Sequence, residues 1–335
     1  MPVSEAPGRD LYDPEGVQRV RDLVGIEVAA LLDDFRLVAG AAPDPLPAGR
    51  GHGVWLWDSY GSRYLDMTAG GGPLLLGHCH TAVVSAAHAQ SAVYSGSAPA
   101  GEHLCASQAR LAKAISDRFP PAPDGRPRMV LFASSGREAL ALASLLGTPA
   151  DPLSDGWQPQ GVADETLSAC RTGTFLAQDR LGFGSVTVLG ESMSGGLPFG
   201  AVVAPADLIG MLDPPPFAAP PAVCAPALAV VSEMTPELLS RSESLAAELR
   251  HQLDSVAGQF PAVLSGAAGT GTLLELRLAE PRAAEFRSAC RSRGLLVGAA
   301  GPASVSFTPA LVAGPAELSH AADVLSDLCL EWVTA

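Results

Sequence analysis

The chain has 335 residues, of which 47% are hydrophobic and 17% charged, and its formal net charge is −14. It is long and apolar enough for one or two domains with buried cores, which excludes a disordered chain. The excess of acidic residues argues against binding to nucleic acid or an anionic membrane surface, because both require clustered lysine and arginine. We see neither the ~20-residue apolar run of a membrane span nor a secretion signal, and therefore expect a cytoplasmic protein.

Cysteine and histidine usage gives no sign of a metal site. The six cysteines are scattered without closely spaced pairs, which favours reduced, buried thiols over disulfides or zinc binding. His78, Cys79 and His80 are adjacent, but no second pair of ligands lies nearby in the sequence. We therefore expect a structural turn at these residues and no metal.

The first 90 residues predict a helix, a linker and a hairpin. Apolar residues recur at helical spacing over residues 14–38, and a proline-rich linker follows up to residue 50. Two short strands are expected at Val54–Asp58 and Arg63–Met67, joined by a tight turn, with a helix after His80.

A strand, a turn and a helix follow one another near residue 133. The apolar strand Met129–Ala133 leads into Ser135, Gly136 and Arg137, and a helix is expected over Leu140–Leu146. The free N–H groups and the dipole at the start of such a helix attract an anion. This pattern predicts an anion-binding cradle.

Two apolar strand-like runs flank a glycine-rich turn within Thr187–Ala204, and the turn carries the carboxylate of Glu191. Lys113 is the only lysine of the chain and lies in a run with helical periodicity over residues 104–119. We expect Lys113 to occupy a solvated helix position.

From Thr235 the sequence predicts a second set of alternating helices and strands. The expected elements are a long helix after Thr235, a strand Thr272–Leu278, a helix Ala283–Arg293, short strands near Leu295 and Val305, and a closing helix from Ala316.

Residues 51–90 and 187–204 together resemble the class III aminotransferases, which have fold type I and use pyridoxal phosphate. The resemblance covers nearly the whole chain apart from a shortened block near residues 149–172. It implies an α/β three-layer sandwich with a truncated central sheet and a small C-terminal α/β domain. The implied parts are an N-terminal helical segment and linker (1–50), a large domain (51–230) and the small domain (231–335).

The shortened block is expected to leave a contiguous sheet of four strands, Met129–Ala133, Gly200–Val203, Val186–Leu189 and Thr174–Gln178. The last strand would then end at Asp179, which the resemblance makes the partner of the pyridine nitrogen. Counting back from Gly182 puts Ala177 there instead.

The same resemblance assigns the remaining site residues. Ser135, Gly136 and Arg137 would be the remnant of the phosphate site, and Glu191 stands where the family has its cofactor lysine. A carboxylate cannot form an imine, so the resemblance implies pyridoxal phosphate but this chain is expected to work without it. Pro216 replaces the family's phosphate-binding threonine and Ser306 an arginine, while the ring-stacking aromatic belongs to the missing block. Arg137 would reach an anionic ligand or pair with Glu191.

Three functions follow from this pattern. The first is a pseudoenzyme that does not transaminate and acts as a homodimer or as the silent partner of an active class III aminotransferase. The second is a repurposed isomerase, lyase or cyclase, in which Glu191 and Asp179 act as acid and base and converge with Arg137 and Arg180. The third is a genuine aminotransferase.

Overall fold

The computed structural model describes residues 45–94, 96, 103–154, 157–158, 161–216 and 218–334. The helix expected over residues 14–38 lies outside these ranges. The chain divides into two compact units, residues 1–51 with 56–63 and residues 52–55 with 64–335, and each is described by itself.

The smaller unit holds most of the strands β1 (Ala48–His52) and β2 (Trp55–Asp58). The guanidinium of Arg50 lies 3.9 Å from the centre of the Trp57 ring. After β2 the turn closes on Asp58, whose Oδ1 accepts the N–H groups of Tyr60 and Ser62 at 2.9 and 2.8 Å. The strand expected at Val54–Asp58 is confirmed to within one residue.

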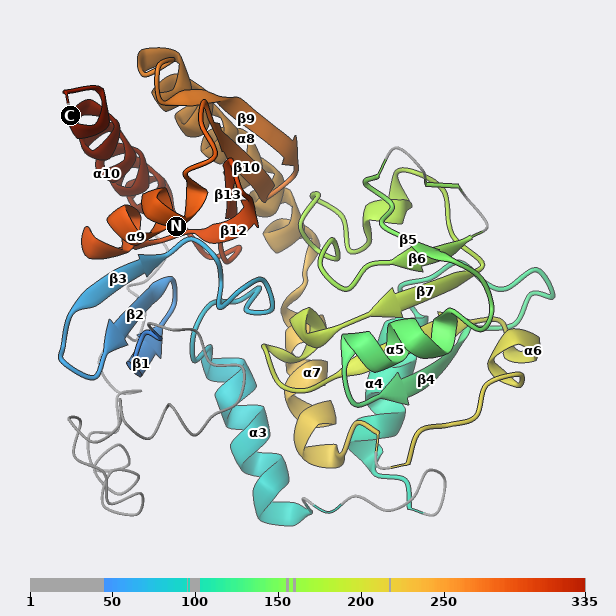
Figure 1. Cartoon of the computed structure of the whole chain (residues 1–335). Helices are drawn as coiled ribbons and strands as arrows, with labels where there is room; N and C mark the ends of the chain where they lie inside the picture. The colour runs from blue at the N-terminus through green and yellow to red at the C-terminus, as the bar shows by residue number, and fades with distance from the viewer. Residues whose placement is uncertain are drawn as a thin grey trace. The chain divides into compact units, whose positions relative to one another are not determined.

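The larger unit contains a five-stranded central sheet in the order β4-β8-β7-β6-β5 (Figure 1). The strands β4 and β7 are antiparallel to β8, whereas β7, β6 and β5 run parallel to one another. Their bounds are β4 (Met129–Ala133), β5 (Pro149–Ala150), β6 (Val162–Asp164), β7 (Val186–Leu189) and β8 (Gly200–Ala204).

The expected strand at Thr174–Gln178 is wrong. The neighbour of β7 is β6, in which Val162 pairs with Val186, and residues 177–179 form the short 3-10 helix η1 (Ala177–Asp179). Glu165 explains the difference. Its fully buried carboxylate accepts the N–H groups of Ala177 and Gln178 at 3.1 and 2.9 Å, so these groups are not available to a strand ladder.

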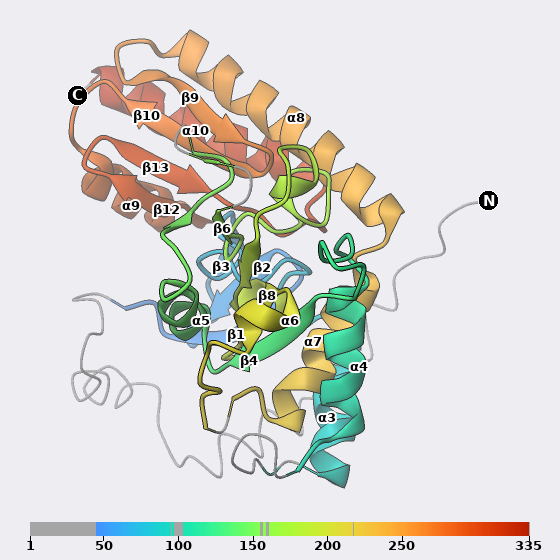
Figure 2. The same ribbon diagram turned by 90° about the vertical axis from the view of Figure 1, so that its right-hand side faces the viewer.

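Both faces of the central sheet are covered, which makes three layers. Along β8, Ala201 and Val203 belong to a core shared with α4 and α7, while Val202 and Ala204 belong to a core shared with α5 and α6. Helix α7 packs against both α3 and α4 (Figures 1 and 2). The helices of this part are α3 (Thr81–Val93), α4 (Ala106–Ser116), α5 (Gly136–Ala143), α6 (Ala206–Ile209) and α7 (Pro221–Glu233).

A four-stranded antiparallel sheet follows in the order β12-β13-β10-β9. Helix α8 lies along β9 and β10 (Figure 2). The elements are α8 (Pro236–Gln259), β9 (Leu264–Thr270), β10 (Leu273–Leu278), α9 (Ala283–Ser292), β12 (Gly298–Gly301), β13 (Ser304–Phe307) and α10 (Pro315–Thr334). The expected helices and the strand over 272–278 are confirmed, and β9 and β12 are additions.

A short parallel pair joins β3 (Arg63–Asp66) to β11 (Leu295–Leu296). Within the described residues, no single helix is long and apolar enough to cross a membrane; α7 and α8, bent by 74°, pass that test only as a pair, by length and composition.

The guanidinium of Arg171 connects segments that are far apart in sequence. It is fully buried and donates to the carbonyl oxygens of Gly72 and Pro309 at 2.5 and 2.9 Å and to Oγ1 of Thr272 at 3.3 Å. The backbone carbonyl of Arg171 also accepts the N–H of Thr272 at 2.9 Å. Gly271 permits this approach, since an added Cβ would lie 2.0 Å from that carbonyl oxygen.

The buried carboxyl group of Glu165 predicts a pH-dependent stability. Burial raises the pKa of Glu165 from 4.5 to about 7, against the opposing effect of its hydrogen bonds from Ser168, Gln178 and Ala177. A carboxyl group with a higher pKa in the folded chain stabilises the fold fully below its unfolded pKa, and this contribution is lost as the pH rises through the folded pKa. The shift corresponds to about 3 kcal/mol.

We therefore expect the wild type to lose up to about 3 kcal/mol of unfolding free energy, relative to Glu165→Gln, between about pH 4.5 and 7. Urea denaturation across this range measures the difference. Glu285→Gln, at an exposed position, serves as the control and should keep the wild-type dependence. Parallel pH curves for wild type and Glu165→Gln would contradict the prediction.

Candidate functional site

The carboxyl ends of four strands lie on one edge of the central sheet. Strands β4, β5, β6 and β7 all point the same way, since β4 and β7 are both antiparallel to β8. Ser135 follows β4, Asp164 ends β6, and Glu191 follows β7 after Gly190. In open α/β sheets this edge is the usual place for a ligand site.

The predicted cradle forms between β4 and α5. Ser135 is the N-cap of α5, and its hydroxyl oxygen accepts the N–H of Glu138 at 3.1 Å. In return, Oε2 of Glu138 accepts the N–H of Ser134 at 2.6 Å. Gly200 in β8 allows the turn to pass close by, because an added Cβ would lie 2.1 Å from the carbonyl oxygen of Ser135.

The carboxylate of Glu191 occupies this cradle. Its Oε1 accepts the N–H of Gly136, the first residue of α5, at 3.0 Å. A Cβ added to Gly136 would meet Oε2 of Glu191 at 3.0 Å, the Cα of Gly190 at 3.1 Å and Cγ2 of Thr166 at 3.2 Å. The space beside the helix terminus is therefore filled by the protein itself.

Of the two alternatives for Arg137, the ion pair with Glu191 does not form. Arg137 is exposed, and the described contacts of Glu191 run to the backbone of Gly136 rather than to the guanidinium. A buried backbone N–H at a helix start is a nearer and better-oriented donor than a flexible surface side chain.

Asp164 holds the place at the strand end beside β7 that the sequence argument gave to Asp179. Its Oδ1 accepts the N–H of Thr166 at 3.0 Å and the hydroxyl of Thr166 at 2.6 Å. The signal for Asp164 was present in the sequence, as an acidic residue directly after the apolar pair Val162 and Ala163.

The other acid and base candidates have separate partners. Asp179 lies in η1 and accepts the N–H of Leu176 at 3.0 Å, and it lines an open depression of about 500 Å³ together with Arg118 and Glu243. Arg180 forms an exposed ion pair with Glu243 at 3.2 Å. The contacts described for Asp179, Arg180 and Glu191 do not join these residues, and their catalytic or cofactor-binding roles stay predictions.

Lys113 occupies the solvated helix position expected of it. Its side chain is 76% exposed, and its Nζ pairs with Asp117 one turn further along α4 at 2.8 Å. Pro216 is exposed in the segment between α6 and α7, and Ser306 is half-buried in β13.

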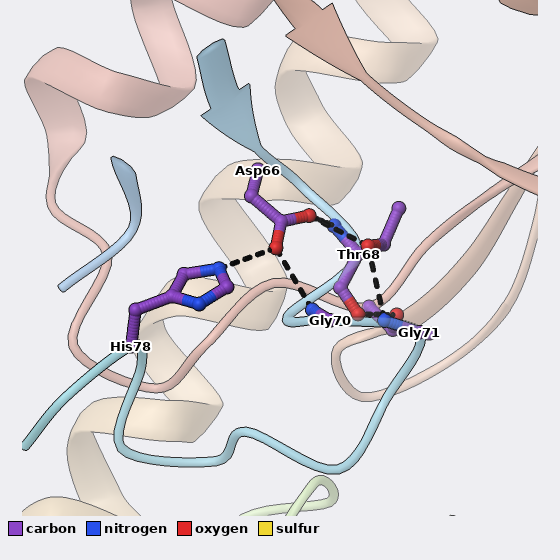
Figure 3. Close-up of polar contacts among 6 residues, drawn as sticks. Asp66, Thr68, Gly70, Gly71 and His78 are labelled. Atoms are coloured by element: carbon purple, nitrogen blue, oxygen red, sulfur yellow. Dashed lines mark hydrogen bonds and ion pairs between the residues drawn. The ribbon is translucent and has the colours of Figure 1, made fainter. Parts of the chain in front are cut away.

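The turn after β3 is organised around Asp66 (Figure 3). Oδ2 of Asp66 accepts from Nε2 of His78 and from the N–H of Gly70, both at 2.8 Å, and Oδ1 accepts from the N–H and hydroxyl of Thr68 at 2.8 and 2.6 Å. Burial alone would raise the pKa of Asp66, but these hydrogen bonds hold it below its usual value. His78 therefore has a structural partner, and Cys79 beside it is exposed.

Within the described ranges, no group of three or more histidine, cysteine, aspartate or glutamate side chains is arranged to hold a metal ion. The six cysteines are free; Cys79 is exposed, Cys105 is half-buried and the other four are buried.

Comparison with known proteins identifies the family. The sequence matches the family described as aminotransferase class-III over residues 39–146 and 162–329. The unmatched residues 147–161 overlap the block expected to be missing near 149–172, while residues 162–172 align with the family.

Curated relatives include two acetylornithine aminotransferases. The one from Streptomyces coelicolor is 28% identical over 363 aligned positions, which cover 80% of this chain and 87% of that enzyme. The one from Gloeobacter violaceus is 32% identical over 161 positions, which cover 46% of this chain and only 40% of that enzyme.

Solved structures show the same fold at low sequence identity. Ornithine aminotransferase from Toxoplasma gondii superposes with a TM-score of 0.80 at 19% identity, covering 95% of this chain and 99% of that one. Acetylornithine aminotransferase from Elizabethkingia anophelis gives a TM-score of 0.77 at 18% identity, covering 90% and 98%. The three-layer fold, the family match over most of the length and these relatives establish that the chain belongs to the class III aminotransferase family.

Proposed function

We propose that this chain is a class III aminotransferase homologue without Schiff-base chemistry, which acts by association as a homodimer or as the silent partner of an active subunit. The observation that carries the proposal is Glu191. It follows β7 at the place that the family resemblance gives to the cofactor lysine, and its carboxylate is bonded to the N–H of Gly136.

Pyridoxal phosphate, which the family uses, makes two demands that these residues do not meet. It requires an amine for the imine, and the only lysine is exposed on α4 and paired with Asp117. It also requires free donors for its phosphate at the start of α5, whereas the N–H of Gly136 already donates to Glu191. The negative charge of Glu191 would in addition repel a phosphate group.

The first test of this proposal is the cofactor itself. Purified protein incubated with pyridoxal phosphate should show no visible imine absorption band and no adduct by mass spectrometry after borohydride reduction. Lys113→Arg, which removes the only lysine, should behave in the same way. A reducible adduct on the wild type would contradict the proposal. If the adduct were absent from Lys113→Arg, it would be assigned to Lys113.

The association is proposed to use the surface of α3. This helix has the sequence TAVVSAAHAQSAV and contains no fully buried residue, although it packs on α7. Val84 and Val93 are 44% and 84% exposed. The two valines are nine residues apart, so they lie on different sides of the helix, and α3 presents apolar side chains on more than one side. Large exposed apolar side chains favour a protein interface, and class III aminotransferases are commonly homodimers. We propose a second copy of this chain as the occupant.

Sedimentation at micromolar concentration should therefore give a dimer for the wild type and a monomer for Val84→Glu with Val93→Glu, since the two substitutions place charges on both sides of α3 and an interface on this helix would desolvate at least one of them. Leu145→Glu, at a position that is 73% exposed on another surface, should stay dimeric. A monomeric wild type would exclude the homodimer and leave the silent-partner version.

A further inference from the structure

The start of α5 has a built anion-binding geometry. The helix has eight residues, its N-cap Ser135 is followed directly by the buried Gly136, and the N–H of Gly136 is directed at a carboxylate oxygen 3.0 Å away. The unpaired N–H groups at a helix start and the helix dipole together favour a negative charge at this position.

The anion that occupies the cradle comes from elsewhere in the chain. The N-cap hydroxyl of Ser135 and the carboxylate of Glu138 supply the local capping, whereas Glu191 lies 55 residues away and belongs to η2 (Glu191–Ser194) after β7. Its contact with Gly136 is therefore a tertiary contact and no part of the helix's own cap.

The segment that carries Glu191 is held firmly on its other side. Ser192 donates to the carbonyl oxygen of Thr166 at 3.2 Å, and Ser194 donates to the carbonyl oxygens of Leu197 and Glu191 at 2.5 and 3.0 Å. Ser192, Met193 and Ser194 are buried. The backbone that carries Glu191 is thus already fixed, so placing the Glu191 side chain against Gly136 costs little additional conformational entropy.

We propose that Glu191 is an intramolecular ligand, a built-in carboxylate that replaces the phosphate of a cofactor in the α5 cradle, and that its removal opens a binding site for phosphate. The inference rests on the proposed absence of Schiff-base chemistry but concerns a different property. Glu191 blocks the site sterically and electrostatically, and it satisfies the first N–H of α5 without any bound ligand.

The test is thermal unfolding in inorganic phosphate, compared with sodium chloride at equal ionic strength. Wild type should show no phosphate-specific change in Tm. Glu191→Ala should have a lower Tm in chloride and should gain Tm progressively as the phosphate concentration rises, because a ligand that binds only the folded state stabilises it. Glu138→Ala is the matched control, since it removes a carboxylate from the same turn that does not contact Gly136.

Three results would overturn the inference: no phosphate-dependent gain in Glu191→Ala, the same gain in wild type, or the same gain in Glu138→Ala. Should Glu191→Ala fail to fold, Glu191→Gln takes its place. The amide oxygen of this variant can still accept from the N–H of Gly136 but carries no charge. The phosphate-dependent gain in Tm should therefore be larger than that of the wild type and smaller than the gain expected for alanine. No gain in Tm would overturn the inference. This experiment does not use pyridoxal phosphate. A negative result would therefore contradict only this inference, whereas a borohydride-reducible adduct would contradict the proposed function.

Discussion

The buried guanidinium of Arg171 is the contact on which the arrangement of the larger unit depends. It carries a positive charge into a fully buried position, where only the carbonyl oxygens of Gly72 and Pro309 and the hydroxyl of Thr272 compensate it. Its Nε has no hydrogen-bond partner among the described residues, and burial lowers the pKa of Arg171 to about 10. An uncompensated buried charge is costly, so displacing any of the three acceptors would destabilise the fold. Three segments far apart in sequence are thereby fixed in one geometry.

The central sheet ends at a very short edge strand, β5. Strand β5 has only two residues and begins with Pro149, which has no N–H to offer to another strand. The neighbouring β6 has three residues, of which Val162 and Ala163 are fully buried. The edge strand therefore offers few free backbone groups to a foreign strand, and β7 and β8 are covered by helices on both faces.

Most of the fold could be predicted from the sequence because its main strands are continuous apolar runs with clear ends. Met129–Ala133, Val186–Leu189 and Gly200–Ala204 all form where their composition indicates. The fourth strand could not be placed. Strand β6 is too short to give a periodic signal, and residues 174–178 are apolar enough to resemble a strand although they do not form one.

The site was harder to predict because its deciding groups are hydrogen bonds between distant residues. The buried carboxylate of Glu165 captures two N–H groups of the segment that was expected to be a strand, and the side chain of Gln178 continues this network to Thr187 at 2.8 Å and to the N–H of Gly184 at 2.8 Å. For Glu191, the carboxylate was recognised, but two hydrogen-bond donors lie within its reach, one of them the charged Arg137 side chain and the other the neutral N–H of Gly136. The choice between the Arg137 side chain and the N–H of Gly136 depends on distances between atoms of residues far apart in the sequence, here 3.0 Å from the Gly136 nitrogen to Oε1 of Glu191. The order of residues does not reveal such distances.

The proposed replacement of a lysine by Glu191 is consistent with the electrostatics of this edge of the sheet. A helix N-terminus carries a partial positive charge, so a cofactor phosphate at the start of α5 would neutralise it and a nearby lysine would be tolerated only while that phosphate was bound. Without a phosphate, a cation after β7 would face the positive end of α5. A carboxylate at the same position reverses this balance, because it is attracted by the helix terminus and accepts its first N–H directly. The anion is then part of the chain, so the contact forms when the protein folds. No separate ligand has to lose its translational freedom on binding. On the proposed function, the exchange that removes the amine needed for imine chemistry is thus the same exchange that gives the first N–H of α5 a partner within the protein.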